Sequence, residues 1–311
     1  MKFYMAPMEG LTGFIYRNAY HRNFGDVDQY ITPFIGNRNL SSREKNDILP
    51  VHNAGLSVVP QILTNRADDF LEIARTLQEY GYDTVNLNLG CPSGTVVAKY
   101  RGAGFLALPD ELDRFLEEIF HKCPLRISIK TRIGVENPGE WERLLAIYEQ
   151  YPLEELIIHP RVQKDFYKNA PRMDAFLFAV KTSRHALCYN GDIASLEDYR
   201  QVTGNIADAK LNRVMLGRGI LKNPGLIGEI RGQKRVSKTA VKKFHDDILV
   251  GYLEVMSGER NTLFRMKELW SYLGQSFTSP EKYLKKIRKT QRVSEYRTLV
   301  DALFSEQEWC P

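Results

Sequence analysis

The sequence is poor in cysteine and histidine, with four Cys and six His among its 311 residues. It has no CxxC pair and too few histidines near the cysteines for a zinc site, and a chain of this size needs no disulfide framework. We therefore expect no metal centre and no disulfide. A reducing cytoplasm is the simplest location, and we expect core roles for Cys123, Cys188 and Cys310.

Long apolar runs are also missing. No segment approaches the roughly 18 consecutive apolar residues of a membrane span, and the stretch before Glu9 is too short for the apolar core of a signal peptide. We therefore expect a soluble protein that is neither secreted nor held in a membrane. A hydrophobic content of 43% allows a large core, and 311 residues are enough for one (β/α)8 barrel plus a small extra domain.

Short β-type runs alternate with amphipathic stretches of helix length over most of the chain, which is typical of parallel strands joined by crossover helices. Two helices carry clear boundary signals, since Gly81 follows ARTLQEY and Pro109 begins PDELDRFLEEIF. Eight β-type runs predict closure into a TIM (β/α)8 barrel. The predicted strands cover residues 3–7, 29–33, 58–63, 85–88, 127–131, 155–159, 186–190 and 213–216.

The alternation ends after Gly225, and the polar segment RGQKRVSK marks a linker that begins near Arg231. Apolar residues then recur every three to four positions, which predicts two helices. Two more should follow, one begun by Ser279 as its cap with Pro280 as its first residue, and one capped by Ser294. We predict a catalytic barrel over residues 1–230 and a four-helix domain over residues 231–311.

Charge separates the two predicted domains. Residues 231–311 hold sixteen Lys and Arg against ten Asp and Glu, a net charge of +6, whereas the rest of the chain has a net charge of −1. A basic cluster on a helical domain is expected of a surface that binds a nucleic-acid backbone. An isolated lysine-rich helix is more often a solvated face. The cluster consists of Lys282, Lys285, Lys286, Arg288 and Lys289.

TIM barrel enzymes place their sites at the carboxyl ends of the strands and often hold phosphate on the loops after strands seven and eight. Those loops here carry Asn190, Gly191 and Asp192, and then Gly217 and Arg218. Glycine lets backbone N–H groups approach a phosphate, and an arginine adds a charged hydrogen bond. Each glycine alone is more often a simple turn, but their joint placement favours a phosphate-bearing cofactor.

Other strand ends supply polar groups. Lys130 ends the fifth predicted strand, where its ammonium could hold the electron-rich edge of a reduced flavin, and Gln61 could hydrogen-bond the same edge. The alternatives are that Lys130 and Arg132 form ion pairs that cap the barrel, and that Gln61 is a satisfied amide at its rim. His159, at the end of the sixth strand, is by itself more often a structural histidine.

The most specific motif is NLNLGCPSGTVVAKYRGAG, which begins at Asn86. Within it, Cys91 lies between a glycine and a proline on the loop after the fourth strand. Its thiol is thereby expected at the barrel mouth, where it could act as an acid, whereas most free cysteines fill a core. Asn88 should face the same opening and could hydrogen-bond a nucleobase or the flavin.

These segments together resemble the tRNA-dihydrouridine synthases. The similarity spans nearly the whole chain, and FRMKELWSYL near its C-terminus resembles the helical tRNA-binding domain of that family. The resemblance implies a TIM barrel followed by a helical bundle, tightly bound FMN that NADPH reduces, and tRNA as the substrate. The barrel motifs, in the family's order, are APMEG at Ala6, NLNLGCPS at Asn86, IKTRIG at Ile129, YNGDI at Tyr189 and MLGRG at Met215.

The resemblance also assigns roles to residues, and Cys91 matches the catalytic acid. In the implied mechanism, a hydride passes from NADPH to FMN and then from flavin N5 to C6 of a flipped-out uridine, and Cys91 protonates C5. The cofactor positions are matched by Pro7 and Met8 against the flavin ring, Gln61 and Lys130 on its pyrimidine edge, His159 beside it, and Asn190, Gly191, Asp192, Gly217 and Arg218 around the phosphate.

Four positions depart from the family pattern. Asn86 stands where Asp is usual, Pro160 and Val162 replace the glycine and threonine of the HisGlyArgThr that begins at His159, and Asp165 stands where a Gln is expected. Because proline fixes φ and removes an N–H, the family's usual contacts cannot be carried over to the loop after the sixth strand.

Two other functions stay open at this point. The chain could be another FMN-dependent barrel reductase that acts on a small molecule, although the basic helical tail argues against it. It could also be a catalytically silent tRNA-binding protein, although the intact Cys91 and Lys130 argue against decay. The sequence does not indicate which uridine is modified or whether NADPH is preferred to NADH, and a monomer is expected.

Overall fold

The structure is a computed structural model that describes residues 1–204, 206 and 211–311. Its internal contacts divide the chain into two compact units. The first, here called the barrel unit, consists of Met1–Pro7, Asp28–Asp192 and Gln201–Leu216. The second, here called the helical unit, consists of Met8–Val27, Ile193–Arg200 and Gly217–Pro311. The functional division of the chain near residue 231 stays a prediction.

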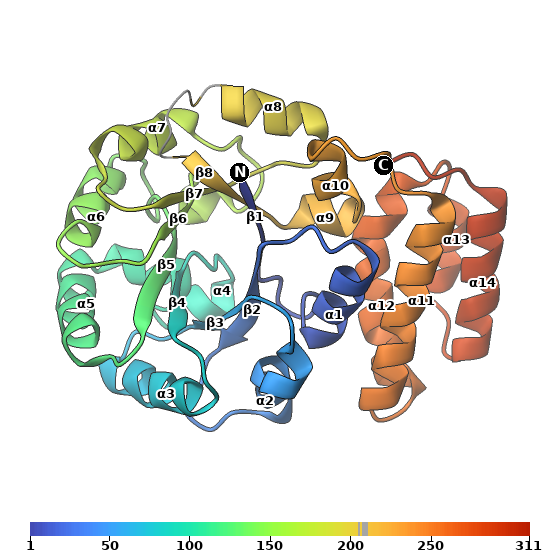
Figure 1. Cartoon of the computed structure of the whole chain (residues 1–311), viewed down its shortest axis with the longest axis horizontal. Helices are drawn as coiled ribbons and strands as arrows, with labels where there is room; N and C mark the ends of the chain where they lie inside the picture. The colour runs from blue at the N-terminus through green and yellow to red at the C-terminus, as the bar shows by residue number, and fades with distance from the viewer. Residues whose placement is uncertain (205, 207–210) are drawn as a thin grey trace. The chain divides into compact units, whose positions relative to one another are not determined.

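The barrel unit is a closed parallel barrel, as predicted. In the part of the chain that the structure describes, eight strands pair in sequence order and β1 closes against β8 (Figure 1). Each strand lies within two residues of a predicted one at its start, because short β-branched runs between helix-forming segments are specific signals. The strands are β1 Lys2–Met5, β2 Gln29–Ile35, β3 Val58–Ile62, β4 Thr84–Leu89, β5 Arg126–Arg132, β6 Leu156–His159, β7 Leu187–Asn190 and β8 Leu211–Leu216.

Helices join consecutive strands of this barrel. Pro109 is the first residue of α5, and Gly81 follows α3 with a φ of +87°, a backbone conformation that favours glycine, so both boundary signals are confirmed. The helices are α2 Ser42–Ile48, α3 Ala67–Glu79, α4 Gly94–Val97, α5 Pro109–Lys122, α6 Glu140–Tyr148 and α7 Met173–Thr182. Three 3-10 turns accompany them: η1 Pro50–Asn53, η2 Gly102–Ala107 and η3 Gln163–Asp165. Helix α8, Leu196–Gly204, has residues in both units.

The interior of the barrel is filled by side chains from its strands. One buried cluster joins Tyr4, Ile31, Ile157, Cys188 and Met215 from five of them, as expected of a barrel that is a packed core and not a pore. The prediction that Cys188 is a core residue is thus confirmed. Other cysteines differ, and the core assignment is wrong for Cys310, which is exposed beside the C-terminal residue. Cys123, which caps the end of α5, is half-buried.

The helical unit contains α1 from the N-terminal part of the chain and the helices that follow the barrel. Residues 231–311, all of them described, form four α-helices, as predicted. None of the helices that the structure describes has the length and apolar character needed to span a lipid bilayer. The helices are α1 Phe14–Asn23, α9 Arg218–Lys222, α10 Leu226–Ile230, α11 Lys238–Val255, α12 Glu259–Leu273, α13 Glu281–Ile287 and α14 Val293–Glu306, with the 3-10 turn η4 Gly274–Ser276.

Two predicted helix starts in this unit are wrong. Helix α13 begins at Glu281 with Pro280 as its cap, and Ser279 has a φ of +44°. Helix α14 begins at Val293, one residue before Ser294, because the carboxylate of Glu259 accepts a hydrogen bond from the Val293 N–H at 3.1 Å. A carboxylate from another helix thus takes the role that we assigned to a local serine.

A buried chain of hydrogen bonds links three helices of this unit. The indole Nε1 of Trp270 donates to the Tyr296 hydroxyl at 2.6 Å, and that hydroxyl lies 2.6 Å from Nε2 of His245. Because the Asp246 carboxylate, 2.9 Å from Nδ1, can only accept, the proton of a neutral ring lies on Nδ1, and Nε2 accepts from the Tyr296 hydroxyl. Burial lowers the pKa of His245, which agrees with a neutral ring.

Candidate active site

A row of amide side chains crosses three strands inside the barrel. Nδ2 of Asn88 donates to Oε1 of Gln61 at 2.8 Å, and Nε2 of Gln61 donates to Oδ1 of Asn86 at 2.7 Å. Nδ2 of Asn86 then donates to the Ser128 hydroxyl at 2.8 Å. An aspartate at position 86 could not make this last donation, so the departure at Asn86 suits the row. Gln61 is a satisfied buried amide, and its contact with a flavin stays a prediction.

The backbone of the Cys91 loop is held by side chains from β4, β5 and the turn η3. Oδ1 of Asn88 accepts hydrogen bonds from the N–H groups of Gly90 at 3.0 Å and Cys91 at 2.9 Å. Nε of Arg132 donates to the Gly90 carbonyl at 3.1 Å, and Nε2 of Gln163 donates to the Pro92 carbonyl at 3.1 Å. The loop that carries the thiol is therefore fixed before any ligand binds. The role of Asn88 as a substrate contact stays a prediction.

A glycine closes this loop from the other side. Gly102 has a φ of +54°, and a Cβ there would lie 2.9 Å from the Cys91 carbonyl oxygen. The next N–H, that of Ala103, donates to the same oxygen at 3.1 Å. The glycine of the NLNLGCPSGTVVAKYRGAG motif therefore allows the chain to pack directly against the cysteine.

The electrostatics of the site keep the Cys91 thiol protonated. Burial raises the pKa of Cys91, and the positive charges of Lys130 and Arg132 offset part of that rise. A protonated thiol that lies near two cations can give up its proton, because the thiolate that forms is stabilised by their charge. This is the behaviour required of a general acid.

Lys130 is a half-buried residue on the strand next to the one that carries Asn88. The two residues are paired in the register of β4 and β5. Burial, and to a smaller degree the charge of Arg132, lowers the pKa of Lys130 to about 8. Among the described residues, no hydrogen bond or ion pair engages the Lys130 ammonium, so the predicted alternative of a capping ion pair is not seen there. An unpaired cation in such a place suits an anionic or electron-rich ligand.

At the end of β6, an arginine organises the polar groups. Nη1 of Arg161 lies 2.9 Å from Nε2 of His159 and 3.0 Å from Oδ1 of Asp192, and its Nη2 pairs with Oδ2 of the same aspartate. Since a guanidinium only donates, Nε2 of His159 accepts and the ring proton lies on Nδ1. Arg161 is 1% exposed, so it links the predicted His159 and Asp192 from within the barrel unit.

The loop after β6 has its own internal structure, built on the departures noted above. The Asp165 carboxylate accepts from the Val162 N–H at 3.0 Å and also pairs with Asn169 and Arg172. The Pro160 carbonyl accepts from the Arg172 N–H at 2.7 Å. Asp165 is thus a structural residue of this loop. Sequence reasoning missed both Gln163 and Arg161, because only the folded loop brings their side chains to Pro92 and Asp192.

The predicted phosphate residues are distributed over both units. In the barrel unit, Nδ2 of Asn190 donates to the Met215 carbonyl at 2.9 Å, and a Cβ on Gly191 would lie 2.2 Å from the Tyr189 hydroxyl oxygen. In the helical unit, Gly217 precedes α9 and Arg218 is its first residue. Pro7 ends the first segment of the barrel unit and Met8 begins the helical unit. A common phosphate site stays a prediction.

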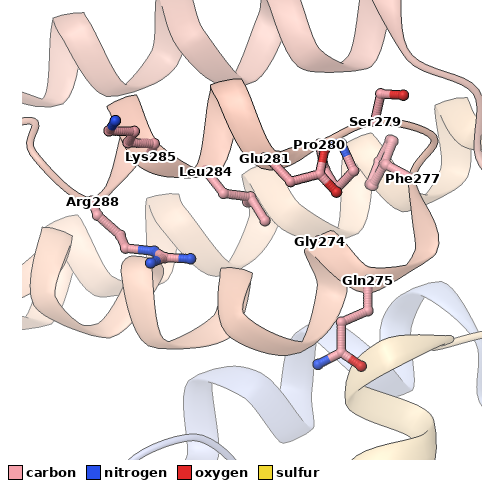
Figure 2. A pocket seen from close by; sticks show the side chains of 9 residues that line it. All are labelled: Gly274, Gln275, Phe277, Ser279, Pro280, Glu281, Leu284, Lys285 and Arg288. Atoms are coloured by element: carbon pink, nitrogen blue, oxygen red, sulfur yellow. The ribbon is translucent and has the colours of Figure 1, made fainter.

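The predicted basic cluster lies on and just after α13. Lys282, Lys285, Lys286, Arg288 and Lys289 are all exposed. Two of them line a surface pocket of about 730 Å³, with Lys285 and Arg288 at one end and Phe277 and Ser279 at the other (Figure 2). Leu284 and Gly274 also line it. The cluster therefore borders a concave surface with positive charge at one end, which a phosphate backbone could enter.

Within the described ranges, no group of three or more His, Cys, Asp or Glu side chains is placed to hold a metal ion. The fold and the site together define a TIM barrel enzyme with a protonated thiol and a half-buried ammonium at the carboxyl ends of its strands.

Comparison with known families identifies the group of enzymes more closely. Residues 4–310 match the family model described as "Dihydrouridine synthase (Dus)". The chain therefore belongs to the dihydrouridine synthase family, and the resemblance noted in the sequence is confirmed.

Individual relatives extend over most of the chain. It is 27% identical over 229 residues to "tRNA-dihydrouridine synthase B" of Pasteurella multocida, covering 72% of this chain and 67% of that protein. It is 23% identical over 320 residues to a "Probable tRNA-dihydrouridine synthase" of Staphylococcus aureus, covering 98% of this chain and 94% of that protein. A solved structure described as "Crystal structure of TcOYE with pHBA" covers 83% of this chain and 96% of its own, with 11% identity and a TM-score of 0.53. That structural likeness supports the fold alone.

Proposed function

We propose that this protein is a tRNA-dihydrouridine synthase, which reduces the C5–C6 double bond of uridine in tRNA. The observation that carries the proposal is the match of residues 4–310 to the dihydrouridine synthase family. Support comes from the Cys91 loop, which holds a protonated thiol near the cations Lys130 and Arg132. A catalytically silent tRNA-binding protein would not need a protonated thiol near two cations.

The proposed cofactor is FMN, with NADPH as the electron donor. Two features of the barrel unit fit it. The half-buried Lys130 ammonium lacks an ion-pair partner in the described part of the chain, and Gly191 keeps the backbone after β7 free of side-chain bulk. We propose that Pro7, Met8, Gln61, Lys130 and His159 hold the flavin ring and that Asn190, Gly191, Asp192, Gly217 and Arg218 hold the phosphate.

The bound and reduced FMN would supply the hydride that C6 of uridine receives. The remaining work falls to residues of the chain. Cys91 gives its proton to C5, and Lys130 and Arg132 stabilise the thiolate that remains. Asn88 keeps the thiol loop in place through two backbone N–H groups. Both atoms of the double bond thus gain hydrogen, and the base is reduced.

The substrate must be presented as an unstacked base, because a uridine inside folded RNA cannot reach groups at a barrel mouth. Extrusion of a base costs a few kcal/mol. We propose that phosphate contacts from the basic cluster on α13 offset this cost, since five exposed cations lie on and just after that helix. The cluster thus contributes affinity and leaves the chemistry to the barrel unit.

The function is tested by anaerobic turnover. We expect purified protein to carry a flavin absorption band, NADPH to bleach it, and unmodified tRNA to restore it in the absence of oxygen. The alternative function, reduction of a small molecule, predicts that enones or free uracil compounds restore the band as fast as tRNA does. A colourless protein that binds no added FMN but still binds tRNA would instead support a silent tRNA-binding protein.

A pH dependence follows from Lys130. Its pKa of about 8 means that the ammonium loses its proton as pH rises through 8. If FMN requires the charged form, binding above that pH takes up one proton, and the dissociation constant should rise by up to about tenfold per pH unit. Fluorescence titration of the apoprotein with FMN between pH 6.5 and 9.5 measures this. Lys130→Met should bind more weakly and lose the dependence, whereas a flat profile for the wild-type protein would disprove the role of Lys130.

A further inference from the structure

We propose that Gln163 is a positioning residue for the Cys91 acid, and this inference rests on the function proposed above. The side chain of Gln163 comes from the turn η3 after β6, whereas Cys91 follows β4. Its amide nitrogen donates to the carbonyl of Pro92, the residue directly after the acid, at 3.1 Å. The hydrogen bond thus spans 71 residues of sequence and ends one residue from the thiol.

Three side chains together restrain the short segment that contains the thiol. Asn88 holds the N–H groups of Gly90 and Cys91, and Arg132 holds the Gly90 carbonyl at 3.1 Å. Both of these side chains act at or before the cysteine. Gln163 is the side chain that holds the segment after the cysteine, as far as the described residues reach. Without it, the segment is fixed by side chains on one side of the thiol only.

Gln163 is itself held rigidly, which a positioning residue requires. It is 7% exposed, and its N–H donates to the Gly134 carbonyl at 2.9 Å. The neighbouring N–H of Lys164 donates to the Val135 carbonyl at 3.1 Å. The turn η3 is therefore tied to the chain that follows β5, and Asp165 closes it by accepting from the Val162 N–H. The backbone of Gln163 is therefore held in place, and its side-chain amide donates to Pro92 from a fixed position.

The same loop explains why position 163 matters in this chain. Arg132 donates from β5 to the Gly90 carbonyl at 3.1 Å and also to the Val162 carbonyl at 2.9 Å. The guanidinium thereby connects the thiol loop with the residue before Gln163. Gln163 and Arg132 thus each link the loop after β4 to the loop after β6, and Cys91 is the residue between Gly90 and Pro92, whose carbonyls they hold. Loss of one link should let the thiol shift while the barrel stays folded.

The consequence for catalysis is a matter of placement. A shift of about 1 Å in a reacting group can cost about 100-fold in rate. Removing the Gln163 donor should therefore slow proton delivery to C5 without removing the acid itself. A loop released on one side should also expose the thiol more often, so that a small alkylating reagent reaches it faster. Thiol reactivity thus reports on the position of Cys91 without any cofactor or substrate.

The test compares Gln163→Met, which keeps the length of the side chain but loses the donor, with Gln163→Ala and the wild-type protein. Lys164→Ala is the matched control, because its exposed side chain pairs with Glu136 on the surface. Iodoacetamide labelling of each cysteine, followed by peptide mass spectrometry, gives the alkylation rate of Cys91. We expect a rise of about fivefold or more in both Gln163 variants, a roughly 10- to 100-fold slower tRNA-dependent reoxidation of the flavin, and wild-type values in Lys164→Ala.

The outcomes separate this inference from the proposed function. Wild-type alkylation and reoxidation rates in Gln163→Met would overturn the inference. Altered rates in Gln163→Ala alone would overturn it too, because the volume of the side chain, and not its hydrogen bond, would then explain the change. Cys91→Ala is measured in parallel. If Cys91→Ala reoxidises at the wild-type rate, the acid role fails, and with it the proposed mechanism. If Cys91→Ala is slow and Gln163→Met is normal, only the positioning role fails.

Discussion

Replacing Cys91 with alanine should divide the reaction into two half-reactions with different fates. Reduction of the flavin by NADPH should proceed at the wild-type rate, because it needs no acid from this loop. Reoxidation by unmodified tRNA should slow by about 10²- to 10⁴-fold, the usual contribution of a positioned general acid. Anaerobic stopped-flow absorbance follows both steps in one instrument. The Cys91 loop is held by hydrogen bonds and its thiol is protonated, so the expected loss falls on proton delivery alone.

Cys310→Ala is the control for this experiment, because Cys310 is exposed near the C-terminus and has no proposed role. It should leave both half-reactions unchanged. Wild-type reoxidation in Cys91→Ala would show that another group supplies the proton. Loss of flavin reduction in the same variant would show that the thiol serves the cofactor and not the substrate.

The second large effect is expected in tRNA binding. Changing the five cations of the basic cluster to glutamine should make the slope of log affinity against log salt less steep by up to about 4, because each lost phosphate contact removes close to one counterion. Binding at low salt should weaken by about 100-fold or more. Filter binding of unmodified tRNA across a salt series measures both. The affected residues are Lys282, Lys285, Lys286, Arg288 and Lys289.

A matched control removes the same number of exposed cations from helices of the barrel unit. It changes Lys45, Arg75, Arg114, Lys122 and Lys181 to glutamine. If tRNA binding depends on the place of the charge, this variant should keep nearly the wild-type slope and affinity. Equal losses in the two variants would mean that only net charge matters, and an unchanged slope in the first would contradict the proposed role of the cluster.

The barrel was predictable from the sequence because its signals are local. Strands such as β5 combine a short run of apolar residues with a polar end at Lys130, and the helices between strands carry their own start and stop residues. Core packing follows from the same pattern, as in the case of Cys188. Local signals were less reliable where a distant group took part. Glu259 sets the start of α14 from another helix, so Ser294 does not act as its cap.

The candidate site was predictable in part, for the same reason. Cys91 and Lys130 lie at strand ends, and the order of strands in a barrel brings the ends together. The groups that hold the site were not predictable, because their partners are set by folded loops. Arg161 reaches Asp192 across 31 residues and Gln163 reaches Pro92 across 71. No motif or spacing in the sequence joins these pairs.

The central claim, that this chain reduces uridine in tRNA, is tested most directly by the mass of the RNA after anaerobic turnover. Unmodified tRNA is incubated with the NADPH-reduced protein, digested and analysed by mass spectrometry. We expect one uridine-containing fragment to gain 2 Da for each flavin that is reoxidised, because two hydrogens add to the base, and we expect no such gain with Cys91→Ala in the same time. Reoxidation of the flavin without any gain in RNA mass would contradict the claim.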